Sequence, residues 1–124
     1  MSETRVGVGI VARRPDGRVL VGRRLAEPGL PLAIPGGKLD PGETIEQCAV
    51  RELLEETDLV LRDPRTFAAV LVDGWLVAGV AGWVEEGEPR VTEPDKFGDF
   101  SWIEPAFPPE DLYPATAAVL ERLP

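Results

Sequence analysis

The stretch that decides the fold of this 124-residue chain runs from Gly36 to Leu59 and reads GGKLDPGETIEQCAVRELLEETDL. Its glycine-rich first part, residues 36–43, is expected to be a loop that opens a helix. Thr44 can cap that helix, and Gln47 stands three residues further on, as a capping box requires. The sequence therefore predicts a helix that begins just after Thr44.

The predicted helix carries a dense set of acids. Glu52, Glu55 and Glu56 stand at positions i, i+3 and i+4, so all three project from one side. Like charges at this spacing repel each other, and folding alone gives no reason to collect them. A divalent cation removes the repulsion, because hard cations take carboxylate oxygens as ligands. The competing interpretation is an exposed acidic helix in an ordinary domain.

The spacing of the whole stretch favours the metal site. The pattern resembles the signature of the Nudix hydrolases, Gly-x5-Glu-x7-Arg-Glu-U-x-Glu-Glu-x-Gly-U with U apolar, here beginning at Gly37 and running through Glu43 and Arg51 to Leu59. Every fixed position matches except the last glycine, which is Asp58 in this chain. Glycine there would supply a left-handed helix end, and Asp tolerates that conformation better than most residues.

Composition limits the class of protein. The length indicates one domain, residues 1–124, and the 44% of hydrophobic residues are enough for a core. A net charge of −9 argues against a nucleic acid polymer and against an anionic membrane surface as partners. It does not exclude a free nucleotide, because a bound metal inverts the local field around phosphates. Cys48 is the single cysteine, and no leader or long apolar run is present, so we expect a cytoplasmic protein.

The rest of the chain reads as strands and one further helix. Turn signals at Arg14-Pro15-Asp16-Gly17 and Asp73-Gly74 predict two hairpins. Strands are predicted at 5–12, 19–22, 32–35, 66–72, 75–84 and 100–103, and a helix at 112–123 that is opened by residues 108–111. This order predicts an α+β protein whose helices cover a mixed sheet. The resemblance implies the Nudix fold, an α/β/α sandwich with a mixed β-sheet.

The residue types point to metal-assisted phosphate chemistry. The chain has no histidine, which excludes a histidine base or a zinc site built on one. Cys48 lies within the helix and is expected to pack rather than react. Divalent ions would neutralise phosphate oxygens and acidify a water for attack at phosphorus. Mg²⁺ is the first choice for oxygen ligands, and Mn²⁺ is the alternative.

The resemblance also implies roles for single residues of the box. Glu52 and Glu56 would be the principal metal ligands, and Glu55 a further ligand or, through water, the base. The backbone carbonyl of Gly36 would help to hold a metal. The remaining roles are supporting ones: Glu43 would orient the carboxylates, Arg51 would pair with them, and Leu53 and Leu54 would pack on the sheet.

Outside the box the resemblance is weaker and points to the MutT-like branch of nucleoside-triphosphate diphosphatases. It rests on the segments Val6–Val11, Gly22-Arg23-Arg24 and Glu93-Pro94-Asp95-Lys96…Trp102. By this alignment Arg24 would meet the substrate, although solvated charge is an equally good interpretation of the arginine pair. Tyr113 would border a base pocket, and Gly36 and Gly37 allow the backbone to come close to a ligand. Two questions stay open. Glu93 is either a distal metal ligand or base, or a turn carboxylate, and Trp83 and Trp102 are either core residues or stacking surfaces for a base.

We therefore expect hydrolysis of a (deoxy)nucleoside triphosphate to the monophosphate and pyrophosphate. One alternative substrate is a nucleoside diphosphate linked to a sugar or another group. A second alternative is a Nudix module that senses a nucleotide without cleaving it, but such modules are expected to lose box carboxylates that this chain keeps. A homodimer is suggested only by analogy with the branch.

Overall fold

The computed structural model describes residues 5–85 and 87–124 of the chain. Within these residues it has seven strands and two helices, in the order β1 (Arg5–Arg13), β2 (Val19–Arg24), β3 (Leu32–Ala33), β4 (Gly36–Lys38), α1 (Ile45–Thr57), β5 (Arg62–Val72), β6 (Trp75–Trp83), β7 (Phe97–Ile103) and α2 (Pro114–Leu120).

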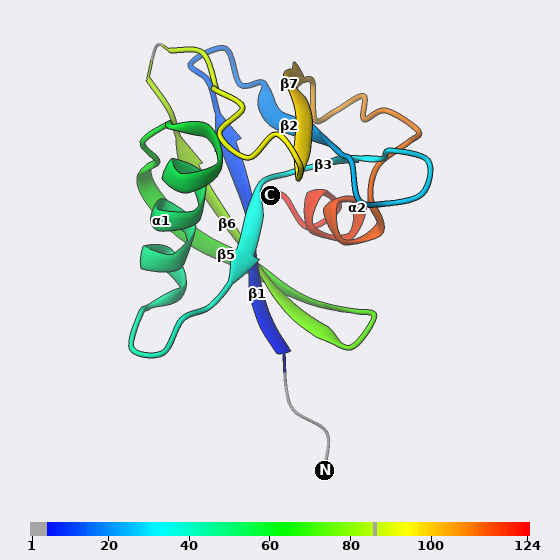
Figure 1. Cartoon of the computed structure of the whole chain (residues 1–124). Coiled ribbons are helices and arrows are strands. Elements are labelled where there is room, and N and C mark those ends of the chain that lie inside the picture. Colours follow the sequence, from blue (N-terminus) through cyan, green and yellow to red (C-terminus); the bar gives the residue numbers. More distant parts are fainter. Residues whose placement is uncertain (1–4, 86) are drawn as a thin grey trace.

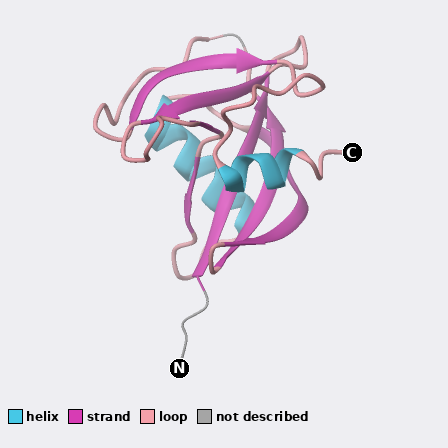
Figure 2. Cartoon of the chain, turned by 90° about the vertical axis from the view of Figure 1, so that its right-hand side faces the viewer, coloured by secondary structure: helices cyan, strands magenta, loops and turns pink. Residues whose placement is uncertain are grey.

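The strands form one mixed sheet that lies between the two helices (Figures 1 and 2). Its path is β3-β2-β1-β6-β5, with β4 paired to β1 and β7 paired to β2. The β1–β6 pair is parallel and the other pairs are antiparallel. The predicted α/β/α sandwich with a mixed sheet is confirmed.

The two central strands divide the core between the helices. Side chains alternate along a strand, so β1 sends Val8 and Ile10 to one face of the sheet and Val11 to the other. Val8 and Ile10 belong to a buried cluster with Leu53 of α1. Val11 belongs to a second cluster with Val119 of α2. Each helix therefore packs on its own face of the two central strands, β1 and β6.

Local sequence signals set both ends of α1. The Thr44 side chain accepts a hydrogen bond from the backbone N–H of Gln47, whose side chain accepts one from the Thr44 N–H, so the predicted capping box is present. At the other end Asp58 has φ 64° and donates its backbone N–H to the carbonyl of Leu54. The departure from glycine at position 58 thus leaves the left-handed helix end intact. One prediction was wrong: Leu54 is 45% exposed, because it lies more than a quarter of a turn away from the buried Leu53.

The glycine-rich segment is partly a strand and not only a loop. Gly36, Gly37 and Lys38 form β4, which pairs antiparallel with β1 through Gly9, Val8 and Gly7 respectively. Of the strand predicted at 32–35 only Leu32–Ala33 is a strand, β3, and β4 begins at Gly36, just beyond the predicted end. This pairing fixes the approach of the chain to α1, where a free loop would leave it variable.

The C-terminal helix is much shorter than predicted. It spans Pro114–Leu120 rather than 112–123, and residues 108–111 do not open it. Leu32 donates its N–H to the Asp111 carbonyl and accepts from the N–H of Tyr113, so this backbone is engaged with β3. A proline also disfavours helical geometry at the residue before it, and Tyr113 precedes Pro114. Both constraints delay the helix until Pro114.

The remaining strands lie where the sequence predicts them, with changed ends. β5 starts at Arg62 and β7 at Phe97, both earlier than expected. The two predicted hairpin turns are present, and Asp73 and Gly74 both have the positive φ that a tight hairpin needs. Of the two tryptophans whose role was left open, Trp102 is partly buried against the cluster that contains Leu53 of α1, whereas Trp83 is 44% exposed. In the described part of the chain neither helix is long and apolar enough to span a membrane.

Candidate functional site

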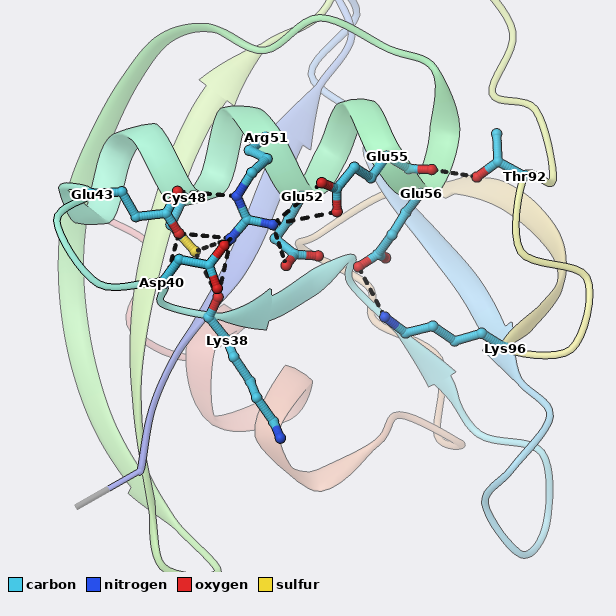
Figure 3. A network of polar contacts seen from close by, with 10 residues as sticks. All are labelled: Lys38, Asp40, Glu43, Cys48, Arg51, Glu52, Glu55, Glu56, Thr92 and Lys96. Atoms are coloured by element: carbon cyan, nitrogen blue, oxygen red, sulfur yellow. Dashed lines mark hydrogen bonds and ion pairs between the residues drawn. The ribbon is translucent and has the colours of Figure 1, made fainter. Parts of the chain in front are cut away.

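Arg51, in the middle of α1, joins one acidic side chain that precedes the helix to two that lie in its second half (Figure 3). Its Nε and Nη2 donate to the two carboxylate oxygens of Glu43, at 3.0 and 2.6 Å. Its Nη1 donates to Glu52 Oε1 at 2.9 Å and lies 3.3 Å from Glu55 Oε2. Nη2 also donates to the backbone carbonyl of Lys38 in β4 at 3.2 Å. One guanidinium thus ties α1 to β4 and holds three glutamates, as the resemblance implies.

This network changes the acidity of its members. The hydrogen bonds from Arg51 lower the pKa of Glu43 to about 2, so this carboxylate stays ionised. Burial raises the pKa of the Cys48 thiol to about 12, and its sulfur donates to the Lys38 carbonyl at 3.4 Å. A thiol that stays protonated is a poor nucleophile. Cys48 is therefore a packing residue, as predicted.

Glu56 stands apart from this network and is almost fully buried. Its side chain is 0% exposed, compared with 13% for Glu52 and 55% for Glu55. Lys96 Nζ lies 3.2 Å from Glu56 Oε1, and Oε2 has no hydrogen-bond partner among the described residues. Burial raises the pKa of Glu56 to about 8, and the nearby Lys96 limits that rise. A buried carboxylate oxygen without a partner is costly unless a cation or a proton meets it.

Two glycines allow β4 to run between β1 and the acidic face of α1. A Cβ atom on Gly37 would overlap the carboxyl group of Glu52, and one on Gly36 would overlap the carbonyl oxygen of Val8. A side chain at position 36 would push β4 away from β1, whereas one at position 37 would displace the carboxyl group of Glu52. The sequence predicts that the backbone at both glycines comes close to a ligand. In this structure the groups that come close to it are protein atoms, the Glu52 carboxyl group and the Val8 carbonyl.

The carboxylates fit a divalent cation in kind but are held by protein cations in this structure. Across residues 5–85 and 87–124, no three acidic side chains meet around a single point. The cause is visible in the contacts, since Arg51 draws Glu52 and Glu43 together while Lys96 holds Glu56. The unpartnered Glu56 Oε2 and the largely buried Glu52 supply oxygen ligands of the type that Mg²⁺ prefers.

A cavity of about 500 Å³ opens beside these acids. Its lining includes Glu52, Lys96 and the predicted substrate residues Arg24, Gly36, Gly37 and Tyr113. The Arg24 guanidinium lies 4.3 Å from the centre of the Tyr113 ring, and its buried Nε has no partner among the described residues. The other arginine of the pair, Arg23, donates to Asp111 and to the Leu30 carbonyl and so has a structural role.

Comparison with known proteins identifies the family. The family described as NUDIX domain matches residues 3–123. The chain belongs to the Nudix family. This match and the relatives described next show that the chain is a Nudix pyrophosphohydrolase that acts on nucleotide pyrophosphate bonds.

The relatives of this Nudix chain cover most of its length. The 8-oxo-dGTP diphosphatase of Escherichia coli is 32% identical over 102 residues, which are 72% of this chain and 78% of that protein. An RNA pyrophosphohydrolase of Novosphingobium aromaticivorans is 29% identical over 94% of this chain and 87% of its own length. A crystal structure of a MutT NUDIX hydrolase from Burkholderia pseudomallei superposes with a TM-score of 0.83, at 32% identity over 99% of this chain and 100% of that one.

The structure adds two residues to this Nudix site for which the sequence analysis proposes no role. Lys96 meets Glu56 from 40 residues away, and Trp75 lines the cavity from the β5–β6 hairpin. No spacing rule links either residue to the box. Glu93, whose role was left open, accepts backbone hydrogen bonds at its carbonyl from Lys96 and Phe97, as a turn residue does.

Proposed function

We propose that this chain hydrolyses a (deoxy)nucleoside triphosphate to the monophosphate and pyrophosphate with Mg²⁺, or with Mn²⁺ in its place. The observation that carries the proposal is a cavity beside α1 that is lined by one glutamate of the box and by cationic side chains. Glu52 lines it together with the cations Arg24 and Lys96, and the unpartnered Glu56 oxygen lies beside Lys96. Its volume of about 500 Å³ is in the range of small-molecule sites.

We assign the metal to Glu52 and Glu56, with Glu55 as a further ligand or as the base through water and the Gly36 carbonyl as an additional ligand. Nudix enzymes generally use a divalent metal such as Mg²⁺. When bound, the cation would neutralise phosphate oxygens and make a water more acidic. Burial of Glu56 supports the assignment, because Lys96 meets only Oε1 and the buried Oε2 has no partner among the described residues, so a bound cation would offset the cost of burying it.

The other residues position these groups and the substrate. Arg51 keeps Glu52 directed toward β4 through its hydrogen bond at 2.9 Å and holds Glu43 through two more. The buried Nε–H of Arg24 has no partner among the residues that the structure describes, which suits an acceptor oxygen on the substrate. In the reaction that we propose, water adds to phosphorus, the anhydride P–O bond breaks and pyrophosphate leaves.

A nucleoside diphosphate linked to a sugar is the alternative substrate, since it presents the same anhydride. Its products would be a nucleoside monophosphate and a phosphorylated sugar, so product analysis separates the two. The 5′ end of an RNA is a further candidate because several relatives are RNA pyrophosphohydrolases, although most of these match over about half of this chain or less. The net charge of −9 weighs against it, since polymer binding draws on a basic surface.

The experiment is a panel of nucleoside triphosphates, nucleoside diphosphate sugars and a 5′-triphosphorylated RNA, each incubated with the protein and Mg²⁺. Pyrophosphate is measured as the phosphate that appears only when inorganic pyrophosphatase is added. The matched control is Glu56→Gln, which keeps the side-chain shape and removes the charge. Turnover of the RNA but of no free nucleotide would replace the proposed substrate.

Three further expectations from the sequence stay predictions. We propose one domain over residues 1–124, a cytoplasmic location and, by analogy with MutT-like enzymes, a homodimer. Limited proteolysis, cell fractionation and sedimentation equilibrium are the respective measurements.

A further inference from the structure

Trp75 is a large aromatic side chain at one end of the cavity. It is the first residue of β6, directly after the Asp73–Gly74 turn. A Cβ on Gly7 would lie 3.6 Å from Cε3 of the indole. Because Gly7 has no side chain, this edge of the ring faces the backbone of β1 and is not covered by a side chain from position 7. The Lys38 ammonium lies 5.7 Å from the centre of the ring.

The cavity wall between Trp75 and α2 has little hydrogen-bonding chemistry to offer a base. Its side chains are mostly small or apolar, among them Gly7, Gly9, Val77 and Ala115, and Asp73 of the hairpin turn is the charged exception next to Trp75. The Thr116 hydroxyl, which also lines the cavity, already accepts the backbone N–H of Ile34 at 3.0 Å. A planar ligand in this part of the cavity would therefore be held by stacking and apolar contact.

The Lys96–Glu56 pair lies toward the end of β4 that is away from Trp75, whereas Lys38 lies at the Trp75 end. Lys38 descends from one end of this short strand, whereas the Lys96–Glu56 pair lies beyond the other (Figure 3). Glu52 lies over Gly37 in the middle of the strand. A nucleotide with its phosphates near Glu52 and Lys96 can thus direct its base along β4 toward Trp75.

We propose that Trp75 is the stacking wall for the nucleobase and gives the cavity a preference for purines over pyrimidines through ring area. This inference rests on the proposed function, because it takes the cavity to be the nucleotide site. Stacking rewards the size of a π-surface and reads no hydrogen-bonding edge. Adenine and guanine nucleotides are therefore expected to bind about equally well.

The test is a fluorescence titration of the metal-free protein with AMP, GMP, CMP and UMP, which requires no turnover. The wild type should bind the purine nucleotides more tightly and show quenched tryptophan emission. Trp75→Ala should weaken AMP and GMP binding by about tenfold and reduce the purine–pyrimidine gap. Trp75→Phe, which can still stack, should keep the affinity within about threefold and lose the quenching.

The matched control is Trp83→Ala. Trp83 ends the same strand on the same face, and Arg13 lies 5.8 Å from its ring centre as Arg5 lies 5.7 Å from that of Trp75. It does not line this cavity, so its variant should bind like the wild type. If Trp75→Ala does not fold, as judged by its thermal melt, the Trp75→Phe titration decides.

The outcomes separate this inference from the proposed function. Unchanged AMP and GMP affinity in Trp75→Ala, or retained quenching in Trp75→Phe, overturns the role of Trp75 even when triphosphate hydrolysis is normal. A wild type that binds none of the four nucleotides also overturns it. Conversely, the expected titration in a protein that cleaves no triphosphate would uphold Trp75 and refute the proposed reaction.

Discussion

Replacing Glu56 with Gln should make the metal-free protein more stable at about pH 8, and the gain should disappear toward about pH 4.5. Burial raises the pKa of Glu56 from 4.5 to about 8. Between these pH values the unfolded chain has released the proton while the folded chain still holds it. The folded state then binds more protons, so its stability falls as the pH rises. Gln has the shape of the protonated acid and does not titrate.

The size of the effect follows from the two pKa values. Each pH unit between 4.5 and about 8 removes about 1.4 kcal/mol of stability, which sets a ceiling of about 5 kcal/mol for the wild type. The attraction to Lys96 is already part of that pKa. In the variant Lys96 loses its partner, but its side chain is 39% exposed and can turn to water. We therefore expect a gain of about 2–5 kcal/mol for Glu56→Gln at about pH 8.

Urea unfolding in EDTA at several pH values between 5 and 8.5 measures this difference directly. The control is Glu55→Gln, which removes a charge from the same helix at a side chain that is 55% exposed. Its stability should follow that of the wild type at every pH. If Glu56→Gln and the wild type keep a constant difference across this range, Glu56 does not titrate as its burial requires.

Two further predictions concern the residues around α1. Gly37→Ala should abolish turnover while the protein stays folded, because its Cβ would overlap the flexible end of Glu52. Gly36→Ala should instead lower the melting temperature, because its Cβ would overlap the backbone carbonyl of Val8. Turnover assays and thermal melts on both variants check this, and full activity in Gly37→Ala would contradict it. Cys48, a buried thiol whose pKa is raised to about 12, should resist a thiol reagent at about pH 8 until urea unfolds the protein; rapid labelling of the folded protein would count against its packing role.

Features set by neighbouring residues were readable from the sequence. The start of α1 depends on Thr44 and Gln47, which are three positions apart and make the whole capping box. The hairpin turn depends on Asp73 and Gly74 alone. The end of α1 at Asp58 follows from one residue that tolerates positive φ. Each of these signals needs only a few consecutive residues, so no tertiary contact overrides it.

Features set by distant residues were not readable. The delayed start of α2 comes from hydrogen bonds between Leu32 and the segment 111–113, which a scan of local propensity does not see. Lys96 reaches Glu56 across 40 positions, and no motif couples them. The sequence predicts that Trp75 belongs to a buried strand. It lines a cavity because the fold places it beside Gly7 of β1, which has no side chain to fill that space. The box thus predicts the acids of the site, while the substrate cavity depends on the fold.

The most direct test of the proposed reaction is the identity of the products formed from a nucleoside triphosphate and Mg²⁺. Chromatography of the nucleotide, together with phosphate release with and without pyrophosphatase, should show the monophosphate and pyrophosphate in equal amounts, and Glu56→Gln should produce neither. Release of orthophosphate and a nucleoside diphosphate, or unchanged turnover in Glu56→Gln, would contradict the reaction and the metal assignment respectively.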